Sequence, residues 1–156
     1  MQIDESENGW IFYNGEKIQK RDIYNLLGKH KVKFTFISTN SSNEQCIVLS
    51  LFDVKCDIYW NEKKYEIPRT KFPTLDISEK QFGKEVILEI ELNEGVISIY
   101  NGATKKEGKL KIVEYAVWGS AMRIEELSPT KKRYYCNDFE NDDDFDDLIF
   151  EMEIMD

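Results

Sequence analysis

Hydrophobic and polar residues alternate along several stretches of the chain, with the two-residue period of half-buried β-strands. The segment 31–38 (KVKFTFIS) carries Val, Phe and Phe at alternate positions. The same period recurs in 86–92 (VILEIEL) and in 148–154 (LIFEMEI). We therefore expect these three segments to form strands that each bury one face.

Turn signals divide the rest of the chain into further short strands. Asn14-Gly15 favours a tight hairpin turn, Asn93-Glu94-Gly95 favours another, and Gly119-Ser120 separates two apolar runs. We expect the remaining strands at 10–13, 16–18, 45–52, 56–60, 65–67, 96–100, 110–118, 121–127 and 131–136.

One segment favours a helix. Residues 21–27 (RDIYNLL) have apolar side chains at helical spacing, and Gly28 follows as a stop signal. Many short strands with almost no helix are typical of an antiparallel β-sandwich or a jelly roll. We expect a single all-β domain over residues 1–156, with residues 1–9 frayed and residues 137–147 forming a loop.

Composition agrees with a folded chain. The 156 residues are 41% hydrophobic and 13% aromatic, which is enough to build a core. No apolar run reaches the length of a membrane span, and residues 1–10 are polar and acidic, so we expect no membrane contact and no secretory signal. Cys46, Cys56 and Cys136 are odd in number and lack CxxC spacing, which predicts reduced, buried thiols in a cytoplasmic protein.

The negative charge of the chain is concentrated at its C-terminal end. The whole chain has 21 Lys and Arg against 30 Asp and Glu, a net charge of −9. Residues 137–156 hold ten of these acids and no Lys or Arg, which leaves 21 basic and 20 acidic residues, a net of +1, over residues 1–136. This balance disfavours nucleic-acid binding, because phosphates require a basic surface.

The most concentrated chemistry lies in the loop 137–147 (NDFENDDDFDD), where five aspartates fall within positions 142–147. Their charges repel one another at the short distances that a loop allows. The cluster is compensated by solvent, by a cation or by a basic partner. Calcium binds several carboxylate and carbonyl oxygens on a flexible loop. The candidate ligands are Asp142, Asp144, Asp146, Asp147, Asn137 and Asp138.

The EF-hand pattern does not account for these residues. Asp142, Asp144, Asp146 and Glu153 fall at its positions one, three, five and twelve, but Asp147 stands where that loop requires glycine. The residues after the loop also alternate with a strand period, whereas an EF-hand needs a helix. We therefore reject an EF-hand.

Another signature fits better. The run 142–150 (DDDFDDLIF) resembles the DxD, aromatic, Asn or Asp, Asp and apolar-strand signature of certain bacterial β-sandwich modules. In those modules an upstream acidic pair ends the preceding strand, and the resemblance implies this part for Asn137-Asp138, which follow Tyr134-Tyr135-Cys136. The resemblance covers about the last twenty residues. It implies a sandwich whose final hairpin is tied at its tip by calcium.

Two alternatives stay open. In the first, the loop is a solvated tip whose aspartates form turns. In the second, the chain is an immunity-type inhibitor that binds a basic protein such as a toxin, because complementary charge speeds association. Its candidate contact residues are Asp143 and Glu140 in the loop and Tyr59 and Trp60 at a strand end. The two aromatic residues also suit a carbohydrate.

Catalysis is not indicated. The sequence contains no GxSxG, HExxH, P-loop or dinucleotide-binding glycine pattern. His30 is the only histidine and follows a polar link, so we expect it at the surface. The sequence therefore predicts a non-catalytic binding module.

Overall fold

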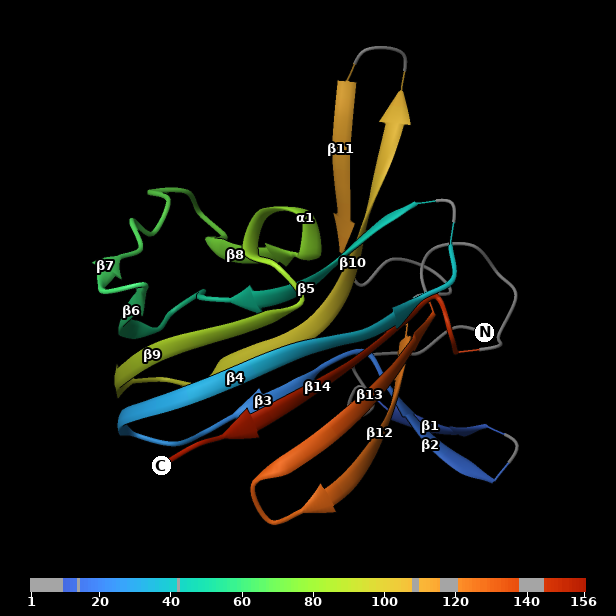
Figure 1. Cartoon of the computed structure of the whole chain (residues 1–156), viewed down its shortest axis with the longest axis horizontal. Helices are drawn as coiled ribbons and strands as arrows, with labels where there is room; N and C mark the ends of the chain where they lie inside the picture. The colour runs from blue at the N-terminus through green and yellow to red at the C-terminus, as the bar shows by residue number, and fades with distance from the viewer. Residues whose placement is uncertain (1–9, 14, 42, 108–109, 116–120, 138–144) are drawn as a thin grey trace.

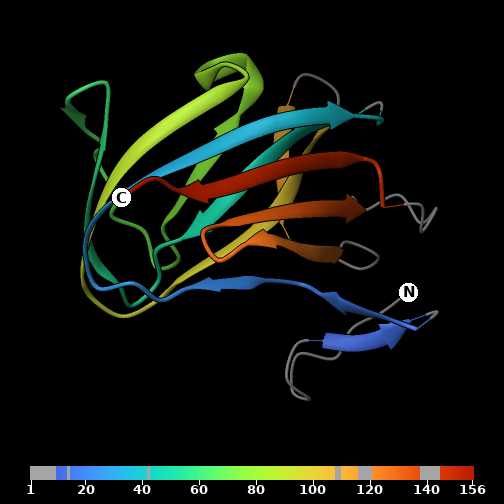
Figure 2. The same cartoon turned by 60° about the horizontal axis from the view of Figure 1, so that its bottom comes forward.

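The computed structural model describes residues 10–13, 15–41, 43–107, 110–115, 121–137 and 145–156. Over these residues the chain forms two antiparallel sheets that pack face to face around a shared apolar core (Figures 1 and 2). The all-β sandwich expected from the sequence is confirmed.

The larger sheet has nine strands within the described residues, and each pairs antiparallel with its neighbours. Their order across the sheet is β1 (Trp10–Tyr13), β2 (Glu16–Gln19), β12 (Ala121–Ser128), β13 (Lys131–Asn137), β14 (Leu148–Ile154), β4 (Gly28–Thr39), β9 (Glu85–Glu94), β6 (Lys55–Trp60) and β7 (Lys63–Lys64).

The smaller sheet contains β11 (Leu110–Tyr115), β10 (Ile97–Glu107), β5 (Glu44–Ser50) and β8 (Thr74–Ser78), in that order. The short strand β3 (Asp22–Tyr24) also pairs with β10. The β10–β11 hairpin projects beyond the other strands (Figure 1). The strand expected to end at Tyr100 continues to Glu107, where β10 pairs in register with β11.

The core forms because apolar and polar residues alternate along the strands. On β4, Val32, Phe34 and Phe36 are at most 1% exposed, and they share one face because successive side chains of a strand point to opposite sides. They pack in one cluster with residues of both sheets, including Leu88 of β9 and Leu49 of β5. Burial of these side chains holds the two sheets together.

The helix expected over 21–27 is wrong. Residues 22–24 form β3, and Tyr24 lies in the core at 3% exposure. The helix in the described residues is α1 (Glu79–Phe82), where the Ser78 Oγ accepts a hydrogen bond from the Gln81 N–H at 3.2 Å. Pairing with β10 overrides the weak local helix preference, which is worth only tenths of a kcal/mol per residue, about 0.7 at most.

All three cysteines are free, as expected. The expected burial is confirmed for Cys46 and Cys136 and is wrong for Cys56, which is half-buried. His30 lies inside β4, where its Nδ1 contacts a carboxylate oxygen of Asp156; this contact raises the His30 pKa. None of the helices in the described residues is long and apolar enough to cross a membrane.

An ion-pair cluster lies along β13 and β14. Glu151 is 7% exposed, and its carboxylate accepts hydrogen bonds from Arg133, whose Nη2 is 2.6 Å away, and pairs with the Lys131 Nζ at 3.3 Å. Burial raises the Glu151 pKa, but the hydrogen bonds and charges of these two bases outweigh it. The net result is a pKa below the ordinary value of 4.5.

We expect Glu151→Gln to lower the melting temperature at pH 7 and to make no difference in acid. A carboxyl whose pKa is lowered by folding stabilises the fold above its unfolded pKa, and this contribution is lost as pH falls through the folded pKa. Calorimetric melting temperatures from pH 8 to pH 3 provide the measurement. Glu85→Gln, at an exposed position, is the matched control. If the melting temperatures of Glu151→Gln and wild type differ by the same amount at every pH, the Glu151 carboxylate charge is not the cause.

Candidate functional site

The acidic loop joins the last residue of β13, Asn137, to the first residue of β14, Leu148. Of the loop's candidate residues, Asn137, Asp146 and Asp147 lie in the described part of the chain. The other candidates from the loop fall outside it: Asp138, Glu140, Asp142, Asp143 and Asp144.

Asn137 connects the two ends of the loop. Its side chain is fully buried, and its Oδ1 accepts a hydrogen bond from the Phe145 N–H at 2.6 Å. Its backbone carbonyl accepts another from the Asn101 Nδ2 on β10, at 2.5 Å. One asparagine therefore closes the base of the loop and ties that base to the opposite sheet.

Phe145 anchors the returning end of the loop. Its side chain is 9% exposed and packs with Ile18 and Ala121, while Tyr135 lies against the same small cluster. Its backbone has a φ of +57°, a conformation that costs a residue other than glycine free energy. The buried ring and the hydrogen bond to Asn137 hold the residue there.

Asn40, just after β4, holds Asp146 and Asp147, the two residues that follow Phe145. Its backbone N–H donates to the carbonyl oxygen of Asp147 at 3.0 Å. Its Nδ2 donates to the Asp146 Oδ2 at 2.9 Å. The Asp146 carboxylate is thus oriented by the side-chain amide of Asn40, a residue far away in sequence that follows β4.

Asp147 is a buried carboxylate, only 2% exposed. Burial raises the pKa of the Cys136 thiol well above its ordinary value, and the negative charge of Asp147 raises it further. Cys136 therefore stays protonated at neutral pH. A protonated, buried thiol is a poor nucleophile, which agrees with a structural role for this cysteine.

The described part of the site supplies hard oxygen atoms. The carboxylates of Asp146 and Asp147 stand at the end of the loop that leads into β14, and the Asn137 carbonyl groups stand at the end that leaves β13. Each Asn137 oxygen accepts one hydrogen bond, and an amide oxygen has two lone pairs. Among the described residues, no group of three or more His, Cys, Asp or Glu side chains is close enough to hold a metal ion. A complete cation site would need residues from 138–144.

The structure does not bring all the predicted contact residues together. Tyr59 and Trp60 lie on β6, which is separated from β14 by β4 and β9 in the larger sheet. Tyr59 pairs with Lys64, and Trp60 pairs with Lys63, so the two aromatic side chains point to opposite faces of the strand. They belong to a different part of the sandwich from the acidic loop.

Sequence reasoning missed Asn40 and Asn101. Asn40 stands in the polar run 38–43, and Asn101 precedes Gly102, so both have the appearance of turn residues. Their role follows from long-range pairing, since β4 lies beside β14 and β10 faces the larger sheet. No local signal in the sequence reveals that role.

Comparison with known proteins gives no relative: no family model matches the chain, and neither a curated protein nor a solved structure is significantly similar to it.

Proposed function

We propose that this protein is a non-catalytic binding module whose acidic C-terminal loop holds a divalent cation, with calcium the best fit. The observation that carries the proposal is the fixed base of the loop. Asn137 and residues 145–147 are held by hydrogen bonds and apolar packing, and the intervening residues 138–144 carry five more acids.

A fixed base favours cation binding in two ways. Ligands that are already held lose less conformational freedom when they bind. Asp147 is also nearly buried, and the attraction between a carboxylate and a cation grows as the local dielectric constant falls. Both effects act on residues that adjoin the most acidic stretch of the chain.

Calcium suits this loop better than magnesium does. Calcium accepts about six to eight oxygen ligands in irregular geometry, whereas magnesium demands a near-octahedral shell and keeps its waters. In the proposed site Asp142, Asp144, Asp146 and Asp147 ligate the ion, and Asn137 or Asp138 assists. Asn40 then acts as a positioning residue, because it orients the Asp146 carboxylate.

We expect calcium to raise the melting temperature of the full chain more than magnesium or sodium does at equal ionic strength. A ligand that binds only the folded state adds about 2.7 kcal/mol when its concentration is a hundred times the dissociation constant. Thermal unfolding followed by circular dichroism provides the measurement. An equal rise with sodium chloride contradicts the proposal, since salt alone screens the repulsion in a solvated loop.

A pair of matched variants sharpens this test. Asp144→Asn removes one proposed ligand and one negative charge, while Asp53→Asn removes the same charge at an exposed position on another loop. The proposal predicts that only Asp144→Asn reduces the calcium effect. If both variants respond to calcium as the wild type does, the loop is not the site. Salt-sensitive co-purification with a basic protein would then favour the immunity-type alternative.

A further inference from the structure

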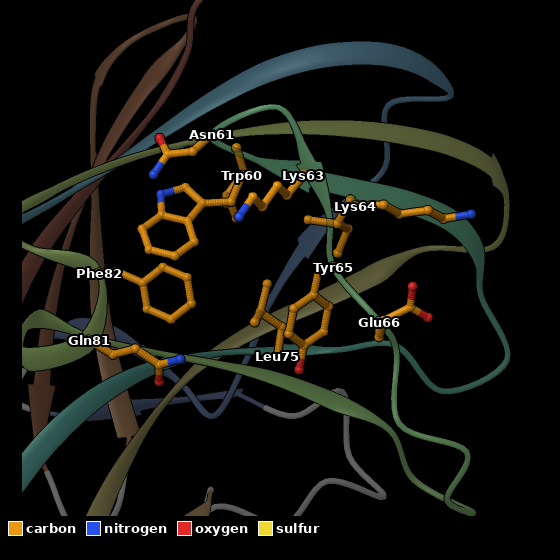
Figure 3. Close-up of a pocket in the computed structure, with 11 residues that line it drawn as sticks. Trp60, Asn61, Lys63, Lys64, Tyr65, Glu66, Leu75, Gln81 and Phe82 are labelled. Atoms are coloured by element: carbon orange, nitrogen blue, oxygen red, sulfur yellow. The ribbon is translucent and has the colours of Figure 1, made fainter.

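A cavity opens between the two sheets at the edge of the sandwich farthest from the acidic loop. It lies beside β6 and β7, the last strands of the larger sheet, and beside β8 and α1 at the edge of the smaller sheet (Figure 3). Its volume is about 490 Å³. Ligand sites in proteins have volumes of roughly 300–1,000 Å³, so this cavity is large enough for a small molecule.

The cavity has an apolar floor and aromatic walls. Ile58, Leu75 and Leu88 form the floor, and all three are at most 2% exposed. The rings of Trp60 and Phe82 form one wall, with centroids 4.6 Å apart and planes tilted by 51°. The Tyr65 ring stands across from them, as Figure 3 shows. Such walls favour a flat apolar group between them.

The β6–β7 hairpin decides which polar groups reach this cavity. Its two turn residues, Asn61 and Glu62, both have positive φ, at 51° and 65°, which is the pattern of a two-residue turn matched to strand twist. The turn places Trp60 opposite Lys63, so these two side chains share the cavity face. The Lys63 side chain reaches back toward the Trp60 indole (Figure 3).

Lys64 and Glu66 also line the cavity, but their charged groups point away from it. The Lys64 Nζ pairs with the Asp57 Oδ1 at 3.0 Å on the other face of the hairpin. The Glu66 carboxylate also points away from the cavity (Figure 3). Within the described residues no carboxylate pairs with Lys63, so its ammonium group is the positive charge that the cavity mouth offers to a ligand.

We propose that this cavity binds a small amphipathic anion, with a flat apolar body between Trp60, Phe82 and Tyr65 and an anionic group, such as a carboxylate, at Lys63. The amide side chains of Asn61 and Gln81 line the same cavity and supply hydrogen bonds at its rim. The site is independent of the proposed cation site, because β4 and β9 separate β6 from β14.

A carbohydrate fits this cavity less well than an anion with an apolar body. A sugar carries hydroxyl groups on all sides, and burying a hydroxyl without a partner costs free energy. The floor of Ile58, Leu75 and Leu88 offers no side-chain hydrogen-bonding group. Aromatic stacking on Trp60 alone does not distinguish the two ligand classes, but the apolar floor does.

Titration of the full chain with 2-naphthoate, followed by amide chemical shifts in NMR spectra, tests the proposal. 2-Naphthamide is the uncharged probe of the same shape, and maltose represents a carbohydrate. We expect 2-naphthoate to bind with a dissociation constant of about 1 mM or lower, with shifts centred on residues 58–66 and 81–82. We expect weaker binding of 2-naphthamide. Equal binding of the two probes, or binding of maltose alone, overturns the proposal.

Two lysines on one short strand provide a matched pair of variants. Lys63→Met is expected to weaken 2-naphthoate binding about threefold to fivefold, as an exposed ion pair allows, and to leave 2-naphthamide unaffected. Lys64→Met is expected to change neither, because the Lys64 ammonium group pairs with Asp57 on the other face of the hairpin. Equal effects of the two substitutions would show that the strand's general charge, and not the cavity, attracts the anion.

The aromatic wall is tested in the same titration. Phe82→Ala is expected to weaken binding of both naphthyl probes about tenfold, because an aromatic contact is lost with its buried area. Phe72→Ala removes an exposed ring outside the cavity and serves as the control. Each variant is shown to be folded if its amide chemical shifts match those of the wild type outside residues 58–66 and 81–82. Unchanged binding to folded Phe82→Ala overturns the proposal.

Discussion

Replacing Phe150 by alanine is expected to lower the free energy of unfolding by about 3–5 kcal/mol, the usual cost of deleting a fully buried aromatic ring. Phe150 lies at the centre of β14 and is fully buried. Its ring stacks on that of Tyr134, which is also fully buried, with centroids 4.4 Å apart and planes 6° apart. The deletion leaves a cavity that a close-packed core fills only in part.

Urea denaturation provides the measurement, because the midpoint and slope together give the free energy. Phe72→Ala is the matched control: it deletes the same atoms from a ring that is 63% exposed, and it should cost less than about 1 kcal/mol. The free energy of unfolding of such domains is only about 5–15 kcal/mol, so Phe150→Ala removes a large part of it. Equal costs for the two substitutions would contradict the position of Phe150 in the core.

The second large effect is expected from Asn137→Ala, at about 1–3 kcal/mol. The substitution removes the acceptor of the Phe145 N–H, and Phe145 is held in a conformation that is unfavourable for a residue other than glycine. A buried donor without an acceptor costs its full desolvation. Because Asn137 closes the base of the loop, calcium affinity should fall together with stability.

Urea denaturation and calcium titration of the same sample separate these two consequences. Asn93→Ala, at an exposed position at the end of β9, is the control and should lie within about 0.5 kcal/mol of wild type. A stability loss without a change in calcium affinity would restrict Asn137 to a structural role. If neither quantity changes, the hydrogen bond to Phe145 does not hold the loop.

The local sequence pattern was sufficient to predict a strand where that strand buries one face. The alternation in 148–154 predicted β14 with the bounds that the structure has, and the alternation in 86–92 predicted the middle of β9. A two-residue period is a property of each strand alone, so it can be read without knowing the partner strands. The sandwich class follows from the number of such strands.

Local pattern failed where a neighbouring strand decides the conformation. Residues 65–67 were expected to form a strand, but the strand that pairs with β6 is Lys63–Lys64. The Tyr65 N–H still donates to the Ile58 carbonyl oxygen at 2.7 Å, and the side chains of Tyr65 and Ile67 pack against the core. Conversely, 74–78 was not expected to be a strand, yet β8 pairs with β5 over its whole length. A short segment of this kind takes its structure from the sheet edge that it meets.

The candidate site shows the same division. The acidic residues and the turn were evident in the sequence, because charge and composition are local properties. The hydrogen bonds that fix the loop were not evident, because they come from distant parts of the chain. Asn40, just after β4, is 106 residues from Asp146, and Asn101, on β10, is 36 residues from Asn137. The different surroundings of Lys63 and Lys64 were likewise not evident, because the hairpin register decides that Lys63 lies opposite Trp60 and Lys64 opposite Tyr59.

The central claim is that the acidic loop, held at both ends, binds a divalent cation. Isothermal titration of the full chain with calcium chloride, at constant ionic strength, tests it most directly. We predict saturable binding of calcium that is stronger than the binding of magnesium and is weakened by Asn137→Ala. An absence of calcium binding up to millimolar concentration, in a chain shown to be folded, would contradict it.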